Sequence, residues 1–242
     1  MNASPIAVQP LSWDSDLLGF PVARLITVGA SHAVVTAALE GARQTGIQLL
    51  YVVAGPHELE ADAAVRQAGA RLVDRKLTFA MSLLGHLPAE TPAAIGTATE
   101  YTAQLESLAW QSGEYSRFRL DPRFDESVFR HLYSLWLRNS LTSAIARRVL
   151  VWRAPDGKEL GLLTLGAKNK RADIGLLAVD ASSRGQRVGQ HLVAAALAQA
   201  QAWGYTELQV VTQRDNEPAC RFYEKCGFAL AHEEYVYHLW LD

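Results

Sequence analysis

The sequence predicts an α/β (α+β) fold built on a mixed sheet, and two stretches of the chain carry this prediction. Residues 147–180 contain three apolar runs, RRVLVWRA, LGLLTLG and ADIGLLAVD, separated by short turns. Such spacing is typical of an antiparallel meander. The following residues alternate helix, strand, helix and strand, a pattern that adds a parallel connection to the meander.

The N-terminal third alternates in the same way. A strand is expected at Val22–Val28, after a polar stretch with Gly19 and Pro21, and a helix at His32–Thr45 that stops at Gly46. QLLYVVAG then reads as a buried strand, ELEADAAVRQAG as a helix ending at Gly69, and RLVDRKLTFAMSLL as a long strand.

A change of composition separates the two alternating regions. The stretch HLPAETPAAIGTATE carries Pro88, Pro92 and Gly96 and is expected to be a linker. We therefore predict an N-terminal α/β half-domain at 1–90 and a second domain at 97–242. The second domain should open with a helix at Tyr101–Trp110, an arginine-rich loop SRFRLDPRFDES, and a helix at Ser127–Ser140.

The bulk composition narrows the function classes. Of 242 residues, 49% are hydrophobic and 20% charged, and the net charge of −2 favours neither nucleic acid nor an anionic membrane as partner. The N-terminus MNASPIAVQP lacks the pattern of a signal peptide, and two cysteines cannot form a disulfide framework. The seven histidines have no metal-ligand spacing. These features predict a cytoplasmic protein without a metal site.

The chain also contains a weak internal repeat. When the N-terminal part is shifted by about 158 positions, ALEGARQTG falls on ALAQAQAWG and AAVRQAGARL on RFYEKCGFAL. Gly46 and Gly69 then fall on Gly204 and Gly227. Both copies keep the apolar skeleton, but polar groups differ: Tyr223 is opposite Val65, Asn216 is opposite Glu58, and SRGQRVGQ is opposite LITVGASH. Because a valine would satisfy packing, Tyr223 is a candidate for chemistry.

The stretch SSRGQRVGQHLV follows an apolar strand and opens a helix. Such a loop turns backbone N–H groups outward at the positive end of a helix, which is how phosphate is bound. Gly185 and Gly189 allow close approach, and Arg184 and Arg187 add charge. The alternative is an ordinary glycine-containing helix start.

Two motifs in order resemble the acetyl-CoA core of the GNAT superfamily of N-acyltransferases. Its loop pattern, Gln/Arg-x-x-Gly-x-Gly/Ala, is matched by Arg184 and Gly189, although Arg187 stands where the first glycine is usual. Its later pattern is matched at Asn216, Ala219, Phe222, Tyr223, Gly227 and Phe228. The resemblance implies a GNAT fold with a mostly antiparallel central sheet, preceded by a degenerate half-GNAT-like domain, and an acetyl-CoA-dependent N-acetyltransferase.

The resemblance also implies roles for individual residues. The pyrophosphate would be held by Arg184, Gly185, Gln186, Arg187, Val188, Gly189 and Gln190. A backbone N–H of Leu177, Ala178 or Val179 would hold the thioester oxygen, while Asn216 and Phe222 would contact the pantetheine arm and its surroundings. Tyr223 would be the general acid for the departing thiolate. Asp74 is a possible base acting through water; its alternative is a solvated strand charge, and a dedicated base is not obligatory.

A narrower resemblance links PLSWDSDLLGFPVARL, SRFRLDP and IGLLAV to the TDP-fucosamine acetyltransferase family. It implies transfer of acetyl to the 4-amino group of a dTDP-4-amino-4,6-dideoxyhexose, within surface polysaccharide synthesis, by a homodimer. Arg117, Phe118 and Arg119 are the candidate nucleotide-sugar contacts, since arginine suits phosphate and Phe118 could stack on a base or sugar. The alternatives are an acetyltransferase of a protein N-terminus or a small amine, and a non-catalytic acyl-CoA-binding module.

Overall fold

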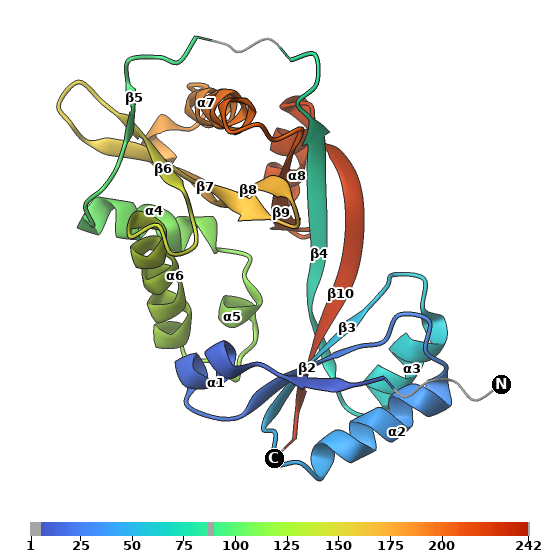
Figure 1. Cartoon of the computed structure of the whole chain (residues 1–242). Helices are drawn as coiled ribbons and strands as arrows, with labels where there is room; N and C mark the ends of the chain where they lie inside the picture. The colour runs from blue at the N-terminus through green and yellow to red at the C-terminus, as the bar shows by residue number, and fades with distance from the viewer. Residues whose placement is uncertain (1–5, 87–89, 242) are drawn as a thin grey trace. The chain divides into compact units, whose positions relative to one another are not determined.

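The computed structural model describes residues 6–86 and 90–241, so Pro88 of the expected linker lies outside the described residues. The chain forms two compact units (Figure 1). The N-terminal unit consists of Met1–Leu77, Gln213–Asp215 and His232–Asp242, and the C-terminal unit of Thr78–Thr212 and Asn216–Ala231. The end of the last strand thus belongs with the N-terminal part of the chain. The sequence-based boundary between 90 and 97 stays a prediction.

The N-terminal unit is a small sheet with two helices on one face. It contains β1 (Val8–Pro10), α1 (Ser12–Leu18), β2 (Val22–Ile26), α2 (His32–Arg43), β3 (Leu49–Ala54) and α3 (Leu59–Gln67). Alternate residues of β2 and β3, such as Leu25 and Val52, pack against Leu39 of α2 and Val65 of α3 in one buried cluster. This burial follows from the strand period of two and the helical spacing of apolar residues.

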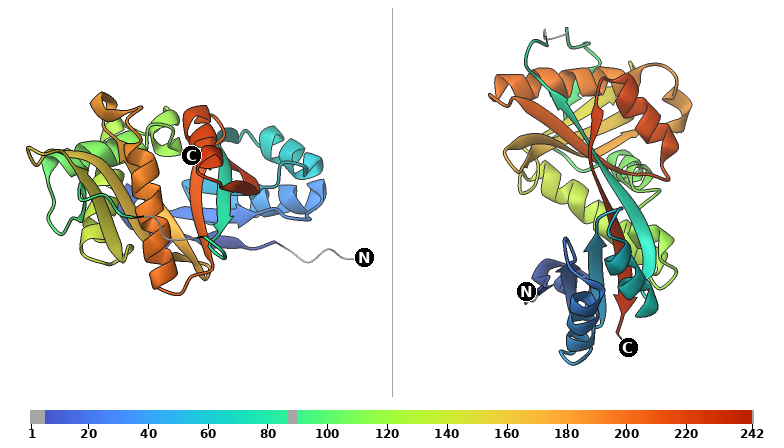
Figure 2. Two further views of the ribbon diagram at one scale, coloured as in Figure 1. Left: turned by 90° about the horizontal axis from the view of Figure 1, so that it is seen from above. Right: turned by 90° about the vertical axis from the view of Figure 1, so that its right-hand side faces the viewer.

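The C-terminal unit has helices on both faces of its sheet. Its elements are β5 (Ile95–Thr97), α4 (Ala103–Ser112), α5 (Arg117–Leu120), α6 (Glu126–Leu141), β6 (Arg148–Arg153), β7 (Glu159–Lys168), β8 (Arg171–Val179), η1 (Ala181–Ser183), α7 (Val188–Ala202), β9 (Glu207–Gln213) and α8 (Glu217–Lys225). Figures 1 and 2 show α7 on one face of the β6–β8 meander, with α4 and α6 on the other.

Two long strands, β4 (Arg71–Ser82) and β10 (Ala229–Trp240), run side by side through both units. In the N-terminal unit the strand order is β1-β2-β3-β10-β4, and in the C-terminal unit it is β10-β4-β9-β8-β7-β6-β5. The β2–β3 and β8–β9 pairs are parallel, whereas the pairs along the meander are antiparallel. The predicted mixed, mostly antiparallel sheet is confirmed.

The secondary structure supports the internal repeat. The bounds of α3 and β4 lie 158 positions before those of α8 and β10. Lys76 and Glu234, which occupy equivalent positions of β4 and β10, form an ion pair of 2.6 Å. Each long strand also lies beside a strand of the other repeat: β10 pairs with β3, and β4 is next to β9 in the strand order. The half-GNAT origin of the N-terminal unit stays a prediction that these matches support.

Local differences from the sequence expectations have simple causes. The SRFR segment, expected as a loop, forms the single turn α5 because the Ser116 side chain accepts a hydrogen bond from the Phe118 N–H and caps it. The polar stretch before β2 contains the unpredicted helix α1, which ends at Gly19 in the left-handed conformation. None of the described helices is long and apolar enough to cross a lipid bilayer.

Candidate active site

The end of β8 is paired on one side only. The antiparallel pairs between β8 and β7 continue to Val179, which lies opposite Gly161. Among the described residues, the parallel pairs between β8 and β9 end at Ile174 and Val210. The backbone groups of Leu177–Val179 that face away from β7 therefore lie outside the β8–β9 ladder. The Val179 carbonyl accepts a hydrogen bond of 3.2 Å from Arg184 Nε, and a ligand can use the N–H groups.

A β-bulge precedes this free edge. Leu163 and Leu165 of β7 face Leu177 and Ile174 of β8, so two residues of β8 stand opposite Thr164. The Thr164 hydroxyl accepts a hydrogen bond of 2.8 Å from the Leu176 N–H, which satisfies a backbone group that the bulge removes from the ladder. Any Cβ at Gly175 would lie 2.9 Å from that hydroxyl oxygen, so the bulge requires glycine there.

The loop between β8 and α7 presents its backbone in the geometry of an anion site. Gly185 has φ +78°, and Arg187 also lies in the left-handed region, with φ +62°. Arg187 thus adopts the backbone that a glycine would favour at this position. It is the N-cap of α7 and has no side-chain capping bond, and the first turn of α7 carries no acidic residue. The first N–H groups of α7 consequently combine with the helix dipole to favour an anion.

Helix α8 closes against α7 beside this loop. A Cβ placed on Gly189 would lie 3.1 Å from Cζ of Phe222, a contact tighter than side chains normally make. Asn216 is the N-cap of α8, and its side-chain oxygen accepts a hydrogen bond of 3.2 Å from the Ala219 N–H. Glycine at 189 therefore permits the close approach of the two helices, and Asn216 holds the start of α8.

Tyr223 lies within an aromatic cluster and also reaches the cavity. Its ring centroid lies 6.1 Å from that of Phe79, 5.3 Å from Phe222 and 5.8 Å from Phe228, and only 6% of the residue is exposed. Burial raises the pKa of the Tyr223 phenol above its ordinary value. The side chain is therefore both core packing and a protonated hydroxyl at neutral pH.

A cavity of about 600 Å³ in the C-terminal unit brings these features together. The sequence-predicted residues on its wall are Leu177, Ala178, Val179, Arg184, Gly185, Arg187, Val188, Gly189, Gln190, Asn216, Phe222 and Tyr223. Three further polar residues on the wall, Gln111, Glu114 and Tyr115, come from the end of α4 and the following turn. No sequence motif pointed to them, because nothing local links this turn to the loop about 70 positions later.

Some predicted residues lie elsewhere. Among the described residues, those lining the cavity do not include Gln186, whose side-chain amide instead donates to the Ser182 carbonyl at 3.2 Å. Asp74 lies on β4 within the N-terminal unit and is 7% exposed, so its interpretation as a solvated strand charge is wrong. Its role as a base stays a prediction.

The SRFR prediction needs one correction. Phe118 is 4% exposed, and its ring packs 5.4 Å from that of Phe124, so this structure leaves no free face for stacking on a base or sugar. Phe118 is the buried residue of α5, whereas Leu120, the other apolar residue of this turn, is 48% exposed, so the Phe118 ring covers the inner face of α5. The Arg117 guanidinium lies over the Phe118 ring, and that of Arg119 over Phe129. Contact of these arginines with substrate stays a prediction.

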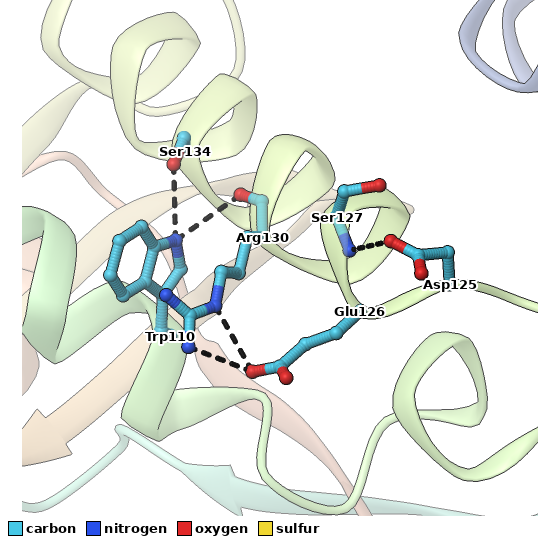
Figure 3. Close-up of polar contacts among 6 residues, drawn as sticks. All are labelled: Trp110, Asp125, Glu126, Ser127, Arg130 and Ser134. Atoms are coloured by element: carbon cyan, nitrogen blue, oxygen red, sulfur yellow. Dashed lines mark hydrogen bonds and ion pairs between the residues drawn. The ribbon is translucent and has the colours of Figure 1, made fainter.

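Arg130 helps to fasten α4, which leads to the new cavity residues, against α6. Figure 3 shows Trp110 of α4 donating from Nε1 to the Ser134 hydroxyl and to the backbone carbonyl of Arg130, at 3.1 and 3.2 Å. The Arg130 guanidinium lies 4.8 Å from the Trp110 ring centroid and donates to Glu126. These contacts hold α4 against α6, and they give Arg130 a structural role.

The charges on the cavity wall complement an anionic ligand. Arg184, Arg187 and Lys225 line it, and the two arginines belong to the loop that leads into the uncapped start of α7. A ligand with phosphate groups and an electrophilic carbonyl would find cations at the loop and backbone N–H groups at the end of β8. The residues present therefore fit an acyl-coenzyme A.

Comparison with known proteins agrees with this chemistry. The model of the acetyltransferase (GNAT) family matches residues 103–228, which is more than half of the chain. The chain belongs to the acetyltransferase (GNAT) family. It is an acyl-CoA-dependent N-acetyltransferase, as the sequence motifs predicted.

The chain is similar to two curated proteins. A dTDP-fucosamine acetyltransferase of Escherichia coli O6:H1 is 28% identical over 222 residues, covering 91% of this chain and 92% of the relative. A spore coat polysaccharide biosynthesis protein, SpsD, of Bacillus subtilis is 27% identical over 139 residues, covering 57% of this chain and 47% of the relative. This chain thus spans under half the length of the second protein.

Solved structures support the fold. A GCN5-related N-acetyltransferase from Sphaerobacter thermophilus is similar with a TM-score of 0.57 and 17% identity, covering 91% of this chain and 73% of that one. A tandem GNAT protein from the clavulanic acid biosynthesis pathway is similar with a TM-score of 0.57 and 18% identity, covering 93% and 76%. The predicted GNAT fold is confirmed.

Proposed function

We propose that the protein transfers an acetyl group from acetyl-CoA to the 4-amino group of a dTDP-4-amino-4,6-dideoxyhexose. The observation that carries the proposal is that the end of β8, the loop before α7 and Tyr223 all line one cavity. The similarity to a dTDP-fucosamine acetyltransferase over 91% of the chain supports the sugar substrate. Synthesis of a surface polysaccharide would be the setting.

Each part of the cavity has a task in this reaction. Arg184, Arg187 and the backbone N–H groups at the start of α7 bind the pyrophosphate of acetyl-CoA. One N–H of Leu177–Val179 donates to the thioester oxygen, where negative charge develops as the amine attacks. Asn216 and Phe222 border the pantetheine arm.

Tyr223 supplies the proton that the leaving sulfur needs. Its phenol stays protonated at neutral pH because burial raises its pKa. Transfer of a proton from a phenol of ordinary pKa about 10 to a thiolate whose thiol has a pKa of about 8.5 is uphill by about 1.5 pKa units, a modest cost that reprotonation of the tyrosinate from solvent then offsets. The Phe79, Phe222 and Phe228 rings around Tyr223 hold it in one orientation.

The acceptor amine and the sugar require further groups. Arg117 and Arg119 contact the nucleotide sugar in this proposal, and Asp74 is one candidate for the base, acting through water. The protein acts as a homodimer in the cytoplasm. Arg117→Ala should raise KM for the sugar and leave KM for acetyl-CoA nearly unchanged.

The test is a substrate panel. Purified protein and acetyl-CoA are incubated with dTDP-4-amino sugars, peptides with free N-termini, aminoglycosides and polyamines, and coenzyme A thiol release is measured. Mass spectrometry then identifies the acetylated product. Thiol release with a dTDP-4-amino sugar, and a product heavier by one acetyl group, is expected. Turnover of a peptide or a simple amine instead would refute the sugar substrate and retain the acetyltransferase.

A further inference from the structure

The cavity wall carries one carboxylate among the described residues that line it, that of Glu114. Its side chain is exposed, while the charged side chains of the loop are the cations Arg184 and Arg187, and Lys225 at the end of α8 is a third cation on the wall. The cations suit the phosphates of acetyl-CoA, and they would repel a protonated amine. A carboxylate on the same wall attracts an ammonium group, so Glu114 gives the cavity a group that can bind a cation.

Glu114 stands on a backbone that the surrounding structure fixes. The Ser116 N–H donates to the Gly113 carbonyl at 2.8 Å, which makes Glu114 and Tyr115 the central residues of a tight turn. Both side chains line the cavity. Ser116 is itself buried and caps α5, so the turn is held on its C-terminal side.

Helix α6 holds the other side of the turn. A Cβ on Gly113 would lie 2.2 Å from Cζ of Tyr133, so only glycine permits this approach of the α4 end to α6. Tyr133 is 7% exposed, and its ring packs 4.8 Å from Phe129, which prevents it from moving aside. The Trp110 contacts in Figure 3 fasten the same end of α4. This support is stronger than a solvated surface glutamate requires.

We infer that Glu114 is a catalytic residue that binds the acceptor amine and takes its proton. This inference rests on the proposed N-acetyl transfer and extends it to the acceptor side. An aliphatic amine has a pKa near 10 and is mostly charged at neutral pH, so it must lose a proton before it attacks. The Glu114 carboxylate binds the ammonium form and receives that proton directly or through one water.

The proposed transfer balances in atoms, electrons and protons. The nitrogen lone pair forms the new C–N bond to the acetyl carbon, and the C–S bond breaks with its electrons on sulfur. Tyr223 gives a proton to that sulfur, and Glu114 takes one from nitrogen. Exchange of protons with solvent then restores both side chains. No oxidant, reductant or metal is needed.

The experiment compares Glu114→Gln with wild type on the amine that the substrate panel identifies. The amide keeps the shape and loses the charge and the basicity. At pH 7, kcat/KM for the acceptor should fall on the order of 10²-fold, the usual contribution of a positioned base. The deficit should shrink as pH rises toward 10, because the amine then deprotonates without help. The dissociation constant of acetyl-CoA, measured by calorimetry, should stay within about twofold of wild type.

Two further variants are compared with Glu114→Gln. Glu126→Gln removes an exposed carboxylate of α6 and should leave kcat/KM near wild type. Asp74→Asn tests the other candidate base. Three results for Glu114→Gln would overturn the role of Glu114. They are a fall in kcat/KM that does not depend on pH, a loss of acetyl-CoA affinity as large as the fall in kcat/KM, and retention of more than a third of the wild-type activity. Loss confined to Asp74→Asn would assign the base to β4. Turnover of a different amine would refute only the sugar substrate, because Glu114→Gln is then measured on that amine.

Discussion

The carboxylate of Glu58 accepts a hydrogen bond of 2.8 Å from the backbone N–H of Gly29, in the loop between β2 and α2. The same carboxylate accepts one of 2.9 Å from the Gly55 N–H. In the internal repeat, Glu58 stands opposite Asn216, and its partner loop stands opposite the loop before α7. In the first repeat, the Glu58 carboxylate thus accepts the backbone N–H groups of this loop. In the second repeat, the corresponding N–H groups are proposed to bind the phosphates of a ligand.

Glu58→Ala should destabilise the protein by about 1–3 kcal/mol, because the buried Thr27 hydroxyl and the N–H groups of Gly29 and Gly55 lose an acceptor. Urea denaturation followed by circular dichroism measures the change. Glu40→Ala, at an exposed position of α2, is the control and should be close to neutral. An equal effect of the two substitutions would show that the Glu58 contacts contribute nothing.

Acetyl-CoA should bind once per chain, in the C-terminal unit, since Glu58 occupies the corresponding loop of the other unit. Gly189→Asp should weaken binding at least tenfold, because its carboxylate would lie beside the pyrophosphate and its Cβ would crowd Phe222. Gly189→Ala crowds Phe222 without adding charge and should weaken binding less. Calorimetry that finds two sites, or unchanged affinity in folded Gly189→Asp, would contradict this assignment.

Arg187 combines a left-handed backbone with a phosphate-binding charge, and two substitutions separate these properties. Both Arg187→Gly and Arg187→Ala should weaken acetyl-CoA binding severalfold, as expected for loss of a partly solvated ion pair. The glycine variant should be more stable than the alanine variant by about 1 kcal/mol, because glycine adopts φ +62° without strain. Thermal melts and calorimetry give the two quantities, and a more stable alanine variant would rule out backbone strain at this position.

Tyr223→Phe keeps the ring in its aromatic cluster and removes the proton donor. We expect kcat to fall on the order of 10²-fold or more, with both KM values nearly unchanged. The protein should stay folded, since loss of one hydroxyl costs no more than about 1–3 kcal/mol. Tyr205→Phe is the control and should retain full activity. If Tyr223→Phe keeps more than about a third of the wild-type kcat, the residue is packing alone.

Glu106 should make part of the stability depend on pH. The Ser134 and Tyr101 hydroxyls donate to its carboxylate and hold its pKa below the ordinary value of 4.5. A carboxyl whose pKa is lower in the folded state stabilises the fold above its unfolded pKa, and this contribution disappears as pH falls through the folded pKa. Urea denaturation between pH 3 and 7 should show it.

Glu106→Gln should lower the stability at pH 7 and reduce the loss between pH 5 and 3. Glu100→Gln, at an exposed position just before α4, is the matched control. Parallel pH profiles of wild type and Glu106→Gln would mean that the network on α4 and α6 does not depend on the charge of this carboxylate.

The features that could be predicted from the sequence depend on residues close together in the chain. The loop before α7, the Asn216 cap and the placement of Tyr223 on α8 each lie within about a dozen positions, so spacing and helix signals define them. The repeat comparison marked Tyr223 and Asn216 as polar groups in an apolar skeleton, and both line the cavity. Strand periodicity likewise predicted the meander and its antiparallel pairing.

What only the tertiary structure decided depends on contacts between distant segments. Whether Phe118 stacks on a ligand or packs against Phe124 depends on which surface α5 covers, and no local pattern contains that information. The pairing of β3 with β10 joins positions nearly two hundred residues apart in the chain. The free energy that stabilises such a pairing comes from the apolar surface that it buries. Glu114 looks like any exposed glutamate in the sequence; packing of Gly113 against Tyr133 places it on the cavity wall. Local signals thus predicted the residues proposed to bind acyl-CoA, and long-range packing decided which residues are proposed to bind the acceptor.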